Sequence, residues 1–354
     1  MPASPLDAED LRSRVAKALD DFLAVQRPIL DEVSDDLTPL LDALTDLLAG
    51  GKRLRPAFCY WGYRGAGGGD DDAALAAATA LELLQACALV HDDVMDGSDT
   101  RRGQPAAHRR FATLHRGNAW LGSSEAFGAG AAILLGDLCL SWADELLMSA
   151  NVPHERLLAG KRVYDVMRTE LMAGQYLDLL EQARGGGSAQ RAMRVVQYKS
   201  AKYTIERPLH LGAALAGADA EISAVYTAYG LPLGEAFQLR DDVLGVFGDP
   251  AQTGKPAGDD LREGKRTLLI AYATEKASPA QRAVLQRHLG DPALAAEGVD
   301  QLREVISVTG ALDHVESLIR ELTDRATNAL SADIAEPART VLTDLAVAAT
   351  ARNA

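Results

Sequence analysis

The segment LELLQACALVHDDVMD, from Leu81 to Asp96, decides both the fold and the chemistry of this chain. Its first part is apolar on nearly every side, as helices at the centre of a bundle are. Asp92 and Asp96 then stand four residues apart, so both project from one helical face. Two such carboxylates repel each other and oppose the helix dipole unless a cation lies between them. A solvated acidic helix end is the alternative, but the apolar flanks and all-oxygen ligands favour a Mg²⁺ site.

A second acidic pair follows the same design. The stretch GEAFQLRDDVLGVFGDP, from Gly234 to Pro250, places Asp241 and Asp242 within another apolar helix. One pair alone could be structural, for example an ion pair with Arg240. Two pairs on separate core helices favour facing ligands in one cavity, where Mg²⁺ ions could surround a diphosphate.

Basic residues lie close to both acidic pairs in the sequence. In GGKRLRP, from Gly50 to Pro56, two glycines precede a helix start, and Lys52 and Arg55 share one face. Glycines and a helix N-terminus both favour a bound anion, although a basic cap on a surface helix has the same pattern. The further cations that could neutralise two diphosphates are Arg101, Arg102, Lys199, Lys255 and Lys265.

Composition and periodicity favour an all-α fold. Of 354 residues, 47% are hydrophobic and only 5% aromatic, which suits helices with a sizeable core. Apolar residues recur at three- and four-residue spacing almost throughout, and no long linker interrupts them, so residues 1–354 are read as a single domain. The expected helices are 7–27, 36–48, 54–64, 73–95, 105–115, 128–150, 154–183, 190–216, 220–247, 265–276, 279–289, 293–308, 311–330 and 335–351.

The charge and the cysteines exclude several classes of protein. The net charge of −14 disfavours binding to nucleic acid or to an anionic membrane surface. Three scattered cysteines, Cys59, Cys87 and Cys139, fit reduced core thiols of a cytoplasmic protein. The N-terminal sequence lacks the pattern of a signal peptide, and no uninterrupted apolar run is long enough to span a bilayer, so stable membrane insertion is not expected.

Together these motifs resemble those of the trans-isoprenyl diphosphate synthase (polyprenyl synthetase) family. GGKRLRP, HDDVMD followed by RRG, YKSA, and FQLRDD followed by GKPAGDDLREGK occur in the family's order and spacing, from about Gly50 to Thr267. The forms HDDVMDGSDTRRG and GVFGDPAQTGKPAGDDLREGKRTLL look like those of actinobacterial geranylgeranyl diphosphate synthases. The resemblance implies an isoprenoid-synthase-type helical bundle around a deep central cavity, usually in a homodimer. It also implies Mg²⁺-dependent, head-to-tail condensation of isopentenyl diphosphate with dimethylallyl, geranyl or farnesyl diphosphate.

The resemblance also implies roles for individual residues. The metal ligands are Asp92, Asp96, Asp241 and Asp242. The catalytic set is Asp92, Asp93, Asp96, Lys199 and Asp241, with Asp93 in a supporting role. The residues that hold isopentenyl diphosphate are Lys52, Arg55, Arg102 and Gln85. The residues around the allylic diphosphate are Arg101, Lys199, Ser200, Gln238, Lys255 and Lys265.

Two departures from the family pattern and one pair of small residues refine this expectation. Gly245 stands where the second motif usually has a third Asp, which predicts weaker metal support, and Ser200 replaces the usual Thr. Cys87 and Ala88 lie about one turn before Asp92, where bulky residues shorten the product of farnesyl synthases. Small residues there predict geranylgeranyl diphosphate as the product, and Cys87→Phe is expected to shorten it.

Other functions stay open at this stage. A farnesyl or longer-chain synthase would share every motif. A terpene cyclase would normally carry an Asn/Ser/Glu metal triad in place of Asp241 and Asp242, and would not need the second basic site. A silent regulatory subunit should have lost acids from one motif, and Gly245 is the one hint of that. A di-iron bundle would need Glu-x-x-His motifs, which the sequence lacks.

Overall fold

The computed structural model of the chain describes residues 5–70, 72–185, 187–248 and 258–350. Within these ranges the regular structure is helical apart from one two-stranded hairpin, which confirms the all-α expectation. The elements of the first half are η1 (Pro5–Asp10), α1 (Leu11–Val33), η2 (Asp35–Leu37), α2 (Thr38–Leu48), α3 (Leu54–Gly65), α4 (Ala73–Asp96), β1 (Thr100–Arg101), β2 (Gln104–Pro105), α5 (Ala107–Gly117) and α6 (Ser124–Met148).

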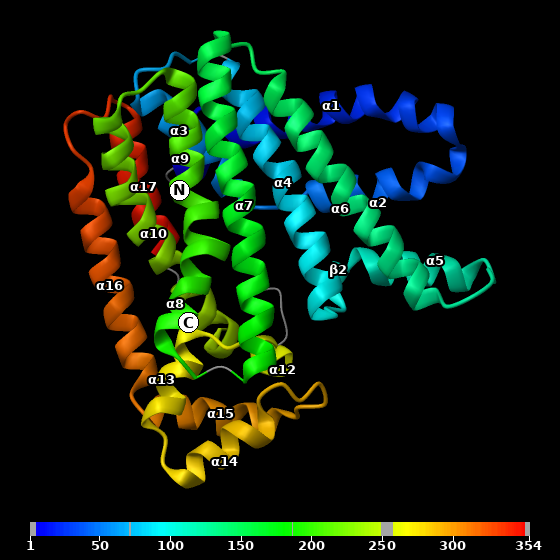
Figure 1. Cartoon of the computed structure of the whole chain (residues 1–354), viewed down its shortest axis with the longest axis vertical. Coiled ribbons are helices and arrows are strands. Elements are labelled where there is room, and N and C mark those ends of the chain that lie inside the picture. The colour runs from blue at the N-terminus through cyan, green and yellow to red at the C-terminus, as the bar shows by residue number, and fades with distance from the viewer. Residues whose placement is uncertain (1–4, 71, 186, 249–257, 351–354) are drawn as a thin grey trace.

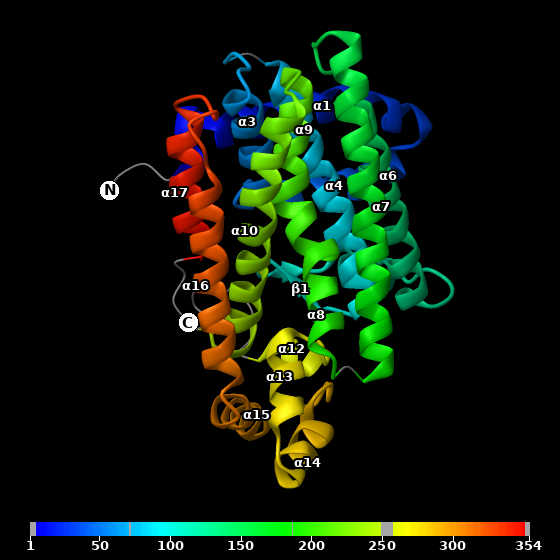
Figure 2. The ribbon, with the colours of Figure 1, turned by 60° about the vertical axis from the view of Figure 1, so that its left-hand side comes forward.

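Long helices of the second half stand beside α4 and complete the bundle (Figure 1). Figure 2 shows α7, α9 and α10 running along the long axis, while shorter helices from α12 to α15 close one end. These elements are α7 (His154–Arg184), α8 (Ala189–Val195), η3 (Val196–Glu206), α9 (Arg207–Ala216), α10 (Ala220–Phe247), α12 (Asp259–Glu263), α13 (Leu268–Lys276), α14 (Pro279–His288), α15 (Ala296–Val308), α16 (Ala311–Ala329) and α17 (Ala338–Thr350).

The composition of α4 explains its central position. Ala74, Ala77 and Ala78 are fully buried, and their small side chains let neighbouring helices approach closely. Leu81 and Leu84 continue the same buried surface toward the acidic end of the helix. The helix ends at Gly97, which has a φ of 66° and accepts the left-handed conformation of a C-cap. The buried face thus fixes the orientation of α4, and the C-cap at Gly97 fixes where the helix ends, just after Asp96.

Two hydrophobic clusters organise the described residues, and α10 contributes to both. Its residues Tyr229 and Leu233 pack in the large cluster around α3, α4 and α9. Further along, Leu239 and Val243 pack in the smaller cluster with α13, α15 and α16. The acidic pair of α10 therefore lies on a helix that is buried along most of its length.

A π-helix, η3, interrupts the segment that the sequence predicts as one helix over 190–216. The wide coil of η3 needs room on two sides. A Cβ on Gly174 of α7 would lie 2.4 Å from the backbone nitrogen of Lys199, and one on Gly234 of α10 would lie 2.6 Å from the Cα of Ala201. Only glycine permits this approach, so these two glycines let α7 and α10 pack closely against η3.

Two helices, α4 and α6, are long and apolar enough to cross a membrane by length and composition. The sequence pattern does not single them out, because polar residues interrupt the apolar run of each. In α4, 78% of the apolar window is buried inside the structure. In α6 the buried share is 39%, because one face of this helix is open to solvent.

Besides η3, the hairpin Thr100–Pro105, which precedes α5, is a feature that the helical periodicity does not predict.

Candidate active site

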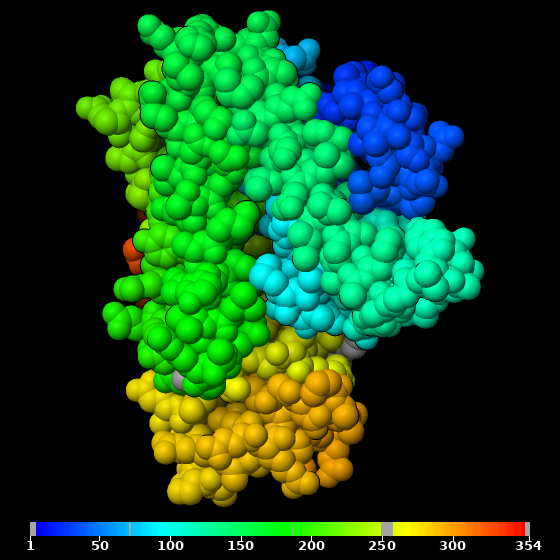
Figure 3. All heavy atoms as spheres, turned by 45° about the vertical axis from the view of Figure 1, so that its right-hand side comes forward, coloured from blue at the N-terminus to red at the C-terminus, as the bar shows by residue number. Residues whose placement is uncertain are grey.

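A cavity of about 600 Å³ opens where α4, α7, η3, α10 and the segment around α12 converge. In the space-filling view a hollow is visible between the cyan end of α4 and the green helices (Figure 3). Twelve of the residues predicted from the sequence line this cavity. They are Lys52, Arg55, Gln85, Ala88, Asp92, Arg101, Lys199, Ser200, Gln238, Asp241, Asp242 and Lys265.

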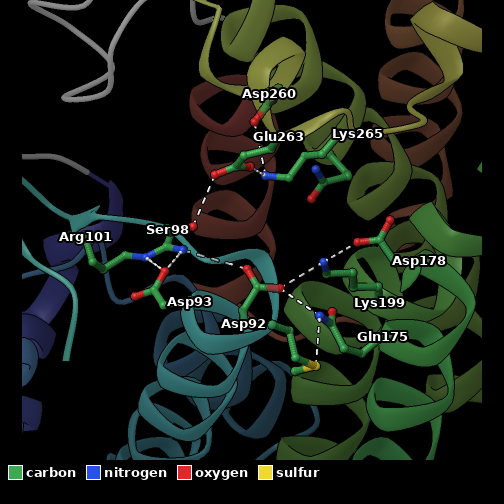
Figure 4. Close-up of polar contacts among 12 residues, drawn as sticks. Asp92, Asp93, Ser98, Arg101, Gln175, Asp178, Lys199, Asp260, Glu263 and Lys265 are labelled. Carbon is green, nitrogen blue, oxygen red and sulfur yellow. Dashed lines mark hydrogen bonds and ion pairs between the residues drawn. The ribbon is translucent and has the colours of Figure 1, made fainter. Parts of the chain in front are cut away.

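Asp92 is the best-connected carboxylate of the first acidic cluster. Its Oδ1 accepts hydrogen bonds from Lys199 Nζ at 3.1 Å and from Gln175 Nε2 at 2.9 Å. Figure 4 shows it between Arg101 on one side and Lys199 on the other. Burial alone would raise the pKa of Asp92, but Lys199, Lys265 and Arg101 outweigh it and lower the pKa. Asp92 is therefore held ionised, facing the cavity.

Asp93 does not line the cavity itself but contacts Arg101, which does. It is only 2% exposed, and its Oδ1 accepts a hydrogen bond from Arg101 Nε at 2.9 Å and another from Nη2 of the same side chain. Burial raises the pKa of Asp93, although Arg101 acts against that rise. These two hydrogen bonds to one oxygen hold the guanidinium of Arg101, which lines the cavity, and this suits the supporting role expected for Asp93.

Lys199 is shared between two carboxylates. Its Nζ donates to Asp178 Oδ2 at 2.6 Å as well as to Asp92. Burial would lower the pKa of Lys199, but Asp178 and Asp92 raise it, so the ammonium stays charged. Because Lys199 belongs to η3, the π-helix decides where this cation stands.

The second acidic cluster, like the first, contains one buried acid, which here is Asp242. Asp242 accepts a hydrogen bond from Gln238 Nε2 at 2.8 Å, one turn back along α10. Burial raises the pKa of Asp242 to about 8, with further contributions from the nearby carboxylates of Asp260 and Asp241. Asp241 and Asp242 both line the cavity, so α10 presents its acids to the same space as α4.

Lys265 connects the two clusters electrostatically. Its Nζ donates to Asp260 Oδ1 at 3.1 Å and pairs with Glu263 Oε2 at 2.7 Å, while Ser98, just beyond α4, donates to Glu263 Oε1 at 3.2 Å. Burial raises the pKa of Asp96 to about 6, and the ammonium of Lys265 opposes that shift, as it does at Asp242. One lysine therefore acts on acids from both helices, which indicates that they border one site.

Lys52 and Arg55, here called the basic wall, continue the cavity lining toward the start of α3. Arg55 donates to Thr204 Oγ1 at 2.7 Å and stacks over the ring of Tyr203 at 4.1 Å. Tyr203 in turn donates to Gln85 Oε1 at 2.8 Å, so this set joins α3, α4 and η3. Arg53 instead points into the core, where it pairs with Glu82. Of the three cations in GGKRLRP, Lys52 and Arg55 face the cavity and Arg53 stabilises the fold.

Some predicted residues do not line the cavity. Arg102 donates to the carbonyl oxygens of Leu47 at 2.7 Å and Gly50 at 2.6 Å, so it braces the loop that precedes Lys52. Cys87 is fully buried, and its sulfur lies 3.8 Å from His91 Nδ1. Asp93 and Asp96 are also not among the residues that line the cavity, and Lys255 lies outside the described residues.

The sequence does not indicate a role for several polar residues of the site, among them Gln175, Asp178, Asp260 and Glu263. Tyr203, Asp259, Arg266 and Thr267 also line the cavity. A signal existed for Asp178, since it is an isolated acid in the apolar run GQYLDLL and stands three residues after Gln175. No local signal in the sequence separates Asp260 from Asp259. What distinguishes Asp260 is its contact with Gly245, which belongs to another helix, α10.

The donor chemistry of the cavity suits magnesium. Its candidate ligands are carboxylates on two helices, and Oδ1 of Asp96 is buried without a hydrogen-bond partner among the described residues. The raised pKa values of Asp96, about 6, and Asp242, about 8, are those of acids that a divalent cation would help to ionise. In the described part of the chain no three His, Cys, Asp or Glu side chains form a closed metal site. This open arrangement suits ions that complete their coordination with substrate phosphates and water.

Comparison with known proteins agrees with this geometry. The family model for polyprenyl synthetase matches residues 38–306. The chain superposes with a TM-score of 0.93 and 40% identity on the crystal structure of geranylgeranyl pyrophosphate synthase from Corynebacterium glutamicum complexed with isoprenyl diphosphate and magnesium, covering 97% of this chain and 99% of that one.

Two curated relatives differ in the length of the product that they are named for. The geranylfarnesyl diphosphate synthase of Aeropyrum pernix is 34% identical over 80% of this chain and 84% of its own length. The geranylgeranyl diphosphate synthase of Methanosarcina mazei is 32% identical over 86% of this chain and 85% of its own. The family match spans both acidic clusters and the basic wall, and the chain belongs to the polyprenyl synthetase family.

Proposed function

We propose that this protein condenses isopentenyl diphosphate head-to-tail with an allylic diphosphate and releases diphosphate, with geranylgeranyl diphosphate as the main product. The observation that carries the proposal is that Asp92 of α4 and Asp241 and Asp242 of α10 border one cavity whose walls also hold Lys52, Arg55 and Lys199. Two separate groups of cations provide for two diphosphates. A terpene cyclase, which takes one, would not need the second group.

The reaction follows from these positions. Ionisation of the allylic C–O bond leaves an allylic cation and diphosphate, and Arg101, Lys199 and Lys265 are placed to hold the departing anion. Magnesium, held by Asp92, Asp96, Asp241 and Asp242, would add positive charge that stabilises the leaving group. Lys52 and Arg55 hold isopentenyl diphosphate so that its double bond attacks the cation. A proton is then lost, with the released diphosphate as base, and Ala88, Leu89 and Leu171 help to exclude water.

The product length is proposed from the apolar part of the cavity. Ala88 lines it one turn below Asp92 and leaves space for a growing chain. The resemblance to geranylgeranyl pyrophosphate synthase over nearly the whole chain supports a twenty-carbon product.

Substitution of one acid from each cluster tests the proposal. Asp92→Asn and Asp241→Asn are each expected to lower turnover by at least about a hundredfold, because each removes a metal ligand. Asp21→Asn changes an exposed acid on α1 and serves as the matched control with unchanged turnover. Full activity in either cluster variant would contradict the proposal.

We also infer a homodimer built on the exposed face of α6. Phe127, Ile133, Leu134 and Met148 present apolar side chains to solvent there, and Leu134 is 65% exposed. Such a face indicates contact with another surface, and self-association through a two-fold axis would cover it. Leu134→Glu should give a monomer in sedimentation experiments, whereas Val308→Glu, an exposed apolar site on α15, should not. A monomeric wild type, or wild-type binding to lipid vesicles through α6, would contradict this inference.

A further inference from the structure

Asp260 lies next to Gly245, the position where the second acidic motif of the family usually has its third Asp. A Cβ on Gly245 would lie 1.8 Å from Oδ2 and 2.6 Å from Cγ of Asp260. The carboxylate of Asp260 therefore occupies the volume that a side chain at position 245 would take. Positions 241 and 245 stand four residues apart on α10, so Asp260 lies against the helical face that carries Asp241.

Asp260 is built into this position. It is 9% exposed, and α12 is anchored by Leu261, whose side chain is buried in the smaller hydrophobic cluster. The Leu261 carbonyl accepts a hydrogen bond from the Gly290 amide at 2.9 Å, and the Asp260 carbonyl accepts one from the Lys265 amide at 3.0 Å. A carboxylate held so firmly out of water costs stability unless a cation balances it.

Several carboxylates lie together around Asp260, on the wall of the cavity that α10 and α12 form. Lys265 pairs with Asp260 but also with Glu263, so one ammonium serves two carboxylates. Asp241 and Asp242 bring two more acids to the same wall of the cavity, and Asp260 lines it beside them.

From this geometry we propose that Asp260 supplies the carboxylate that Gly245 lacks and completes the metal-binding set of the second acidic cluster. The inference rests on the proposed function, because it assumes that the cluster binds divalent cations with a diphosphate. It explains how a chain with Gly245 can keep a full set of acids: the third carboxylate comes from α12 and reaches α10 across the cavity wall. It also replaces the sequence-based expectation of weaker metal support at this cluster.

Manganese binding measures this role without turnover. Mn²⁺ would be titrated by electron paramagnetic resonance in the presence of a non-ionisable thiolodiphosphate analogue of the allylic substrate. Asp260→Asn is expected to weaken Mn²⁺ binding by about tenfold or more. The matched control is Glu263→Gln, which breaks the other ion pair of Lys265 and should weaken binding far less.

An exchange of acids gives a second, independent test. Gly245→Asp alone should weaken Mn²⁺ binding, because the new side chain collides with Asp260. The double variant Gly245→Asp/Asp260→Gly returns the acid to α10 and should bind Mn²⁺ nearly as the wild type does. If Asp260→Asn does not fold, as judged by its melting curve, the double variant decides the question.

The outcomes separate this inference from the proposed function. Wild-type Mn²⁺ affinity in Asp260→Asn, or a double variant that binds no better than Gly245→Asp, overturns the role of Asp260 while the wild-type enzyme still condenses its substrates. Failure of the wild type to bind Mn²⁺ with the analogue would overturn both.

Discussion

At the scale of single residues, the site is a set of carboxylate–cation pairs, and Asp178 belongs to one of them. Lys199 Nζ donates to Asp178 as well as to Asp92, so its ammonium does not pair with Asp92 alone. Without Asp178, the ammonium would compete more strongly with a metal ion for Asp92.

Asp178→Asn is therefore expected to lower kcat by about tenfold and to raise the Mg²⁺ concentration needed for half-maximal rate. Steady-state kinetics at a series of Mg²⁺ concentrations measure both effects. Asp165→Asn, on the same helix but paired with Lys161 and Arg168, is the matched control with wild-type kinetics. An unchanged Mg²⁺ dependence in Asp178→Asn would show that Asp178 only stabilises the fold.

The chain-length residues make a second prediction at this scale. Ala88 lines the cavity, whereas Cys87 is buried against His91. Ala88→Phe should shorten the main product to farnesyl diphosphate or less, as measured by mass spectrometry. Cys87→Phe has to enlarge a packed region, and it should cost about 1–3 kcal/mol of unfolding free energy with a smaller effect on the product. A longer or unchanged product from Ala88→Phe would contradict this assignment of the cavity floor.

The buried acids predict proton release on ligand binding. Burial raises the pKa of Asp242 from 3.8 to about 8, so this carboxyl is largely protonated at neutral pH in the metal-free protein. Because its folded pKa exceeds its unfolded value, Asp242 destabilises the metal-free fold increasingly as pH rises from 3.8 to about 8. A bound cation favours the ionised form and should expel the proton.

Calorimetric titration of Mg²⁺ with the thiolodiphosphate analogue, in buffers of different ionisation enthalpy, measures this release. The expected result is net proton release at pH 7 that disappears well above pH 8, where Asp242 is already ionised. Asp242→Asn is the control and should release fewer protons. Equal heats in all buffers at pH 7 would mean that Asp242 does not change its ionisation.

At the scale of elements, the π-helix η3 sets the position of Lys199 and Ser200, and it depends on the absence of side chains opposite. Gly174→Ala would place a Cβ 2.4 Å from the Lys199 nitrogen, so the helices must move apart. The expected cost is about 1–3 kcal/mol of unfolding free energy, together with reduced turnover because Lys199 shifts.

Gly117→Ala at the end of α5 provides the matched control, since nothing lies within 4 Å of the added Cβ. That change should leave both the unfolding free energy and the rate close to those of the wild type. Chemical denaturation and steady-state kinetics on both variants give the comparison. Equal stability of the two variants would mean that α7 and η3 are not tightly packed.

The elements also show what the sequence predicts and what it does not. Helical periodicity predicts α4, α7 and α10, because each carries a long apolar pattern with a clear end, such as Gly97 after α4. It does not reveal η3, since π and α coils share much of the same local pattern, and the reason for the π-helix lies in Gly174 and Gly234 on other helices. The cavity-lining acids of α4 and α10 were predictable because an acid pair in an apolar helix is unusual.

At the scale of the whole molecule, helices from distant parts of the chain bring two acidic pairs and a basic wall to one cavity. Asp260 was not predictable at this level, because its contact with Gly245 requires α12 and α10 to be adjacent. The direction of Cys87, away from the cavity, likewise depends on how α4 is rotated in the bundle. Tertiary packing decides both.

The most direct measurement of the central claim is product analysis by mass spectrometry. The purified protein would be incubated with Mg²⁺, isopentenyl diphosphate and each of dimethylallyl, geranyl and farnesyl diphosphate in turn. The account predicts geranylgeranyl diphosphate from every starter, with one diphosphate released per isopentenyl unit added. Chains no longer than farnesyl would contradict the proposed product. Cyclic hydrocarbon from a single diphosphate, or no condensation at all, would contradict the assignment of two diphosphate sites to this cavity.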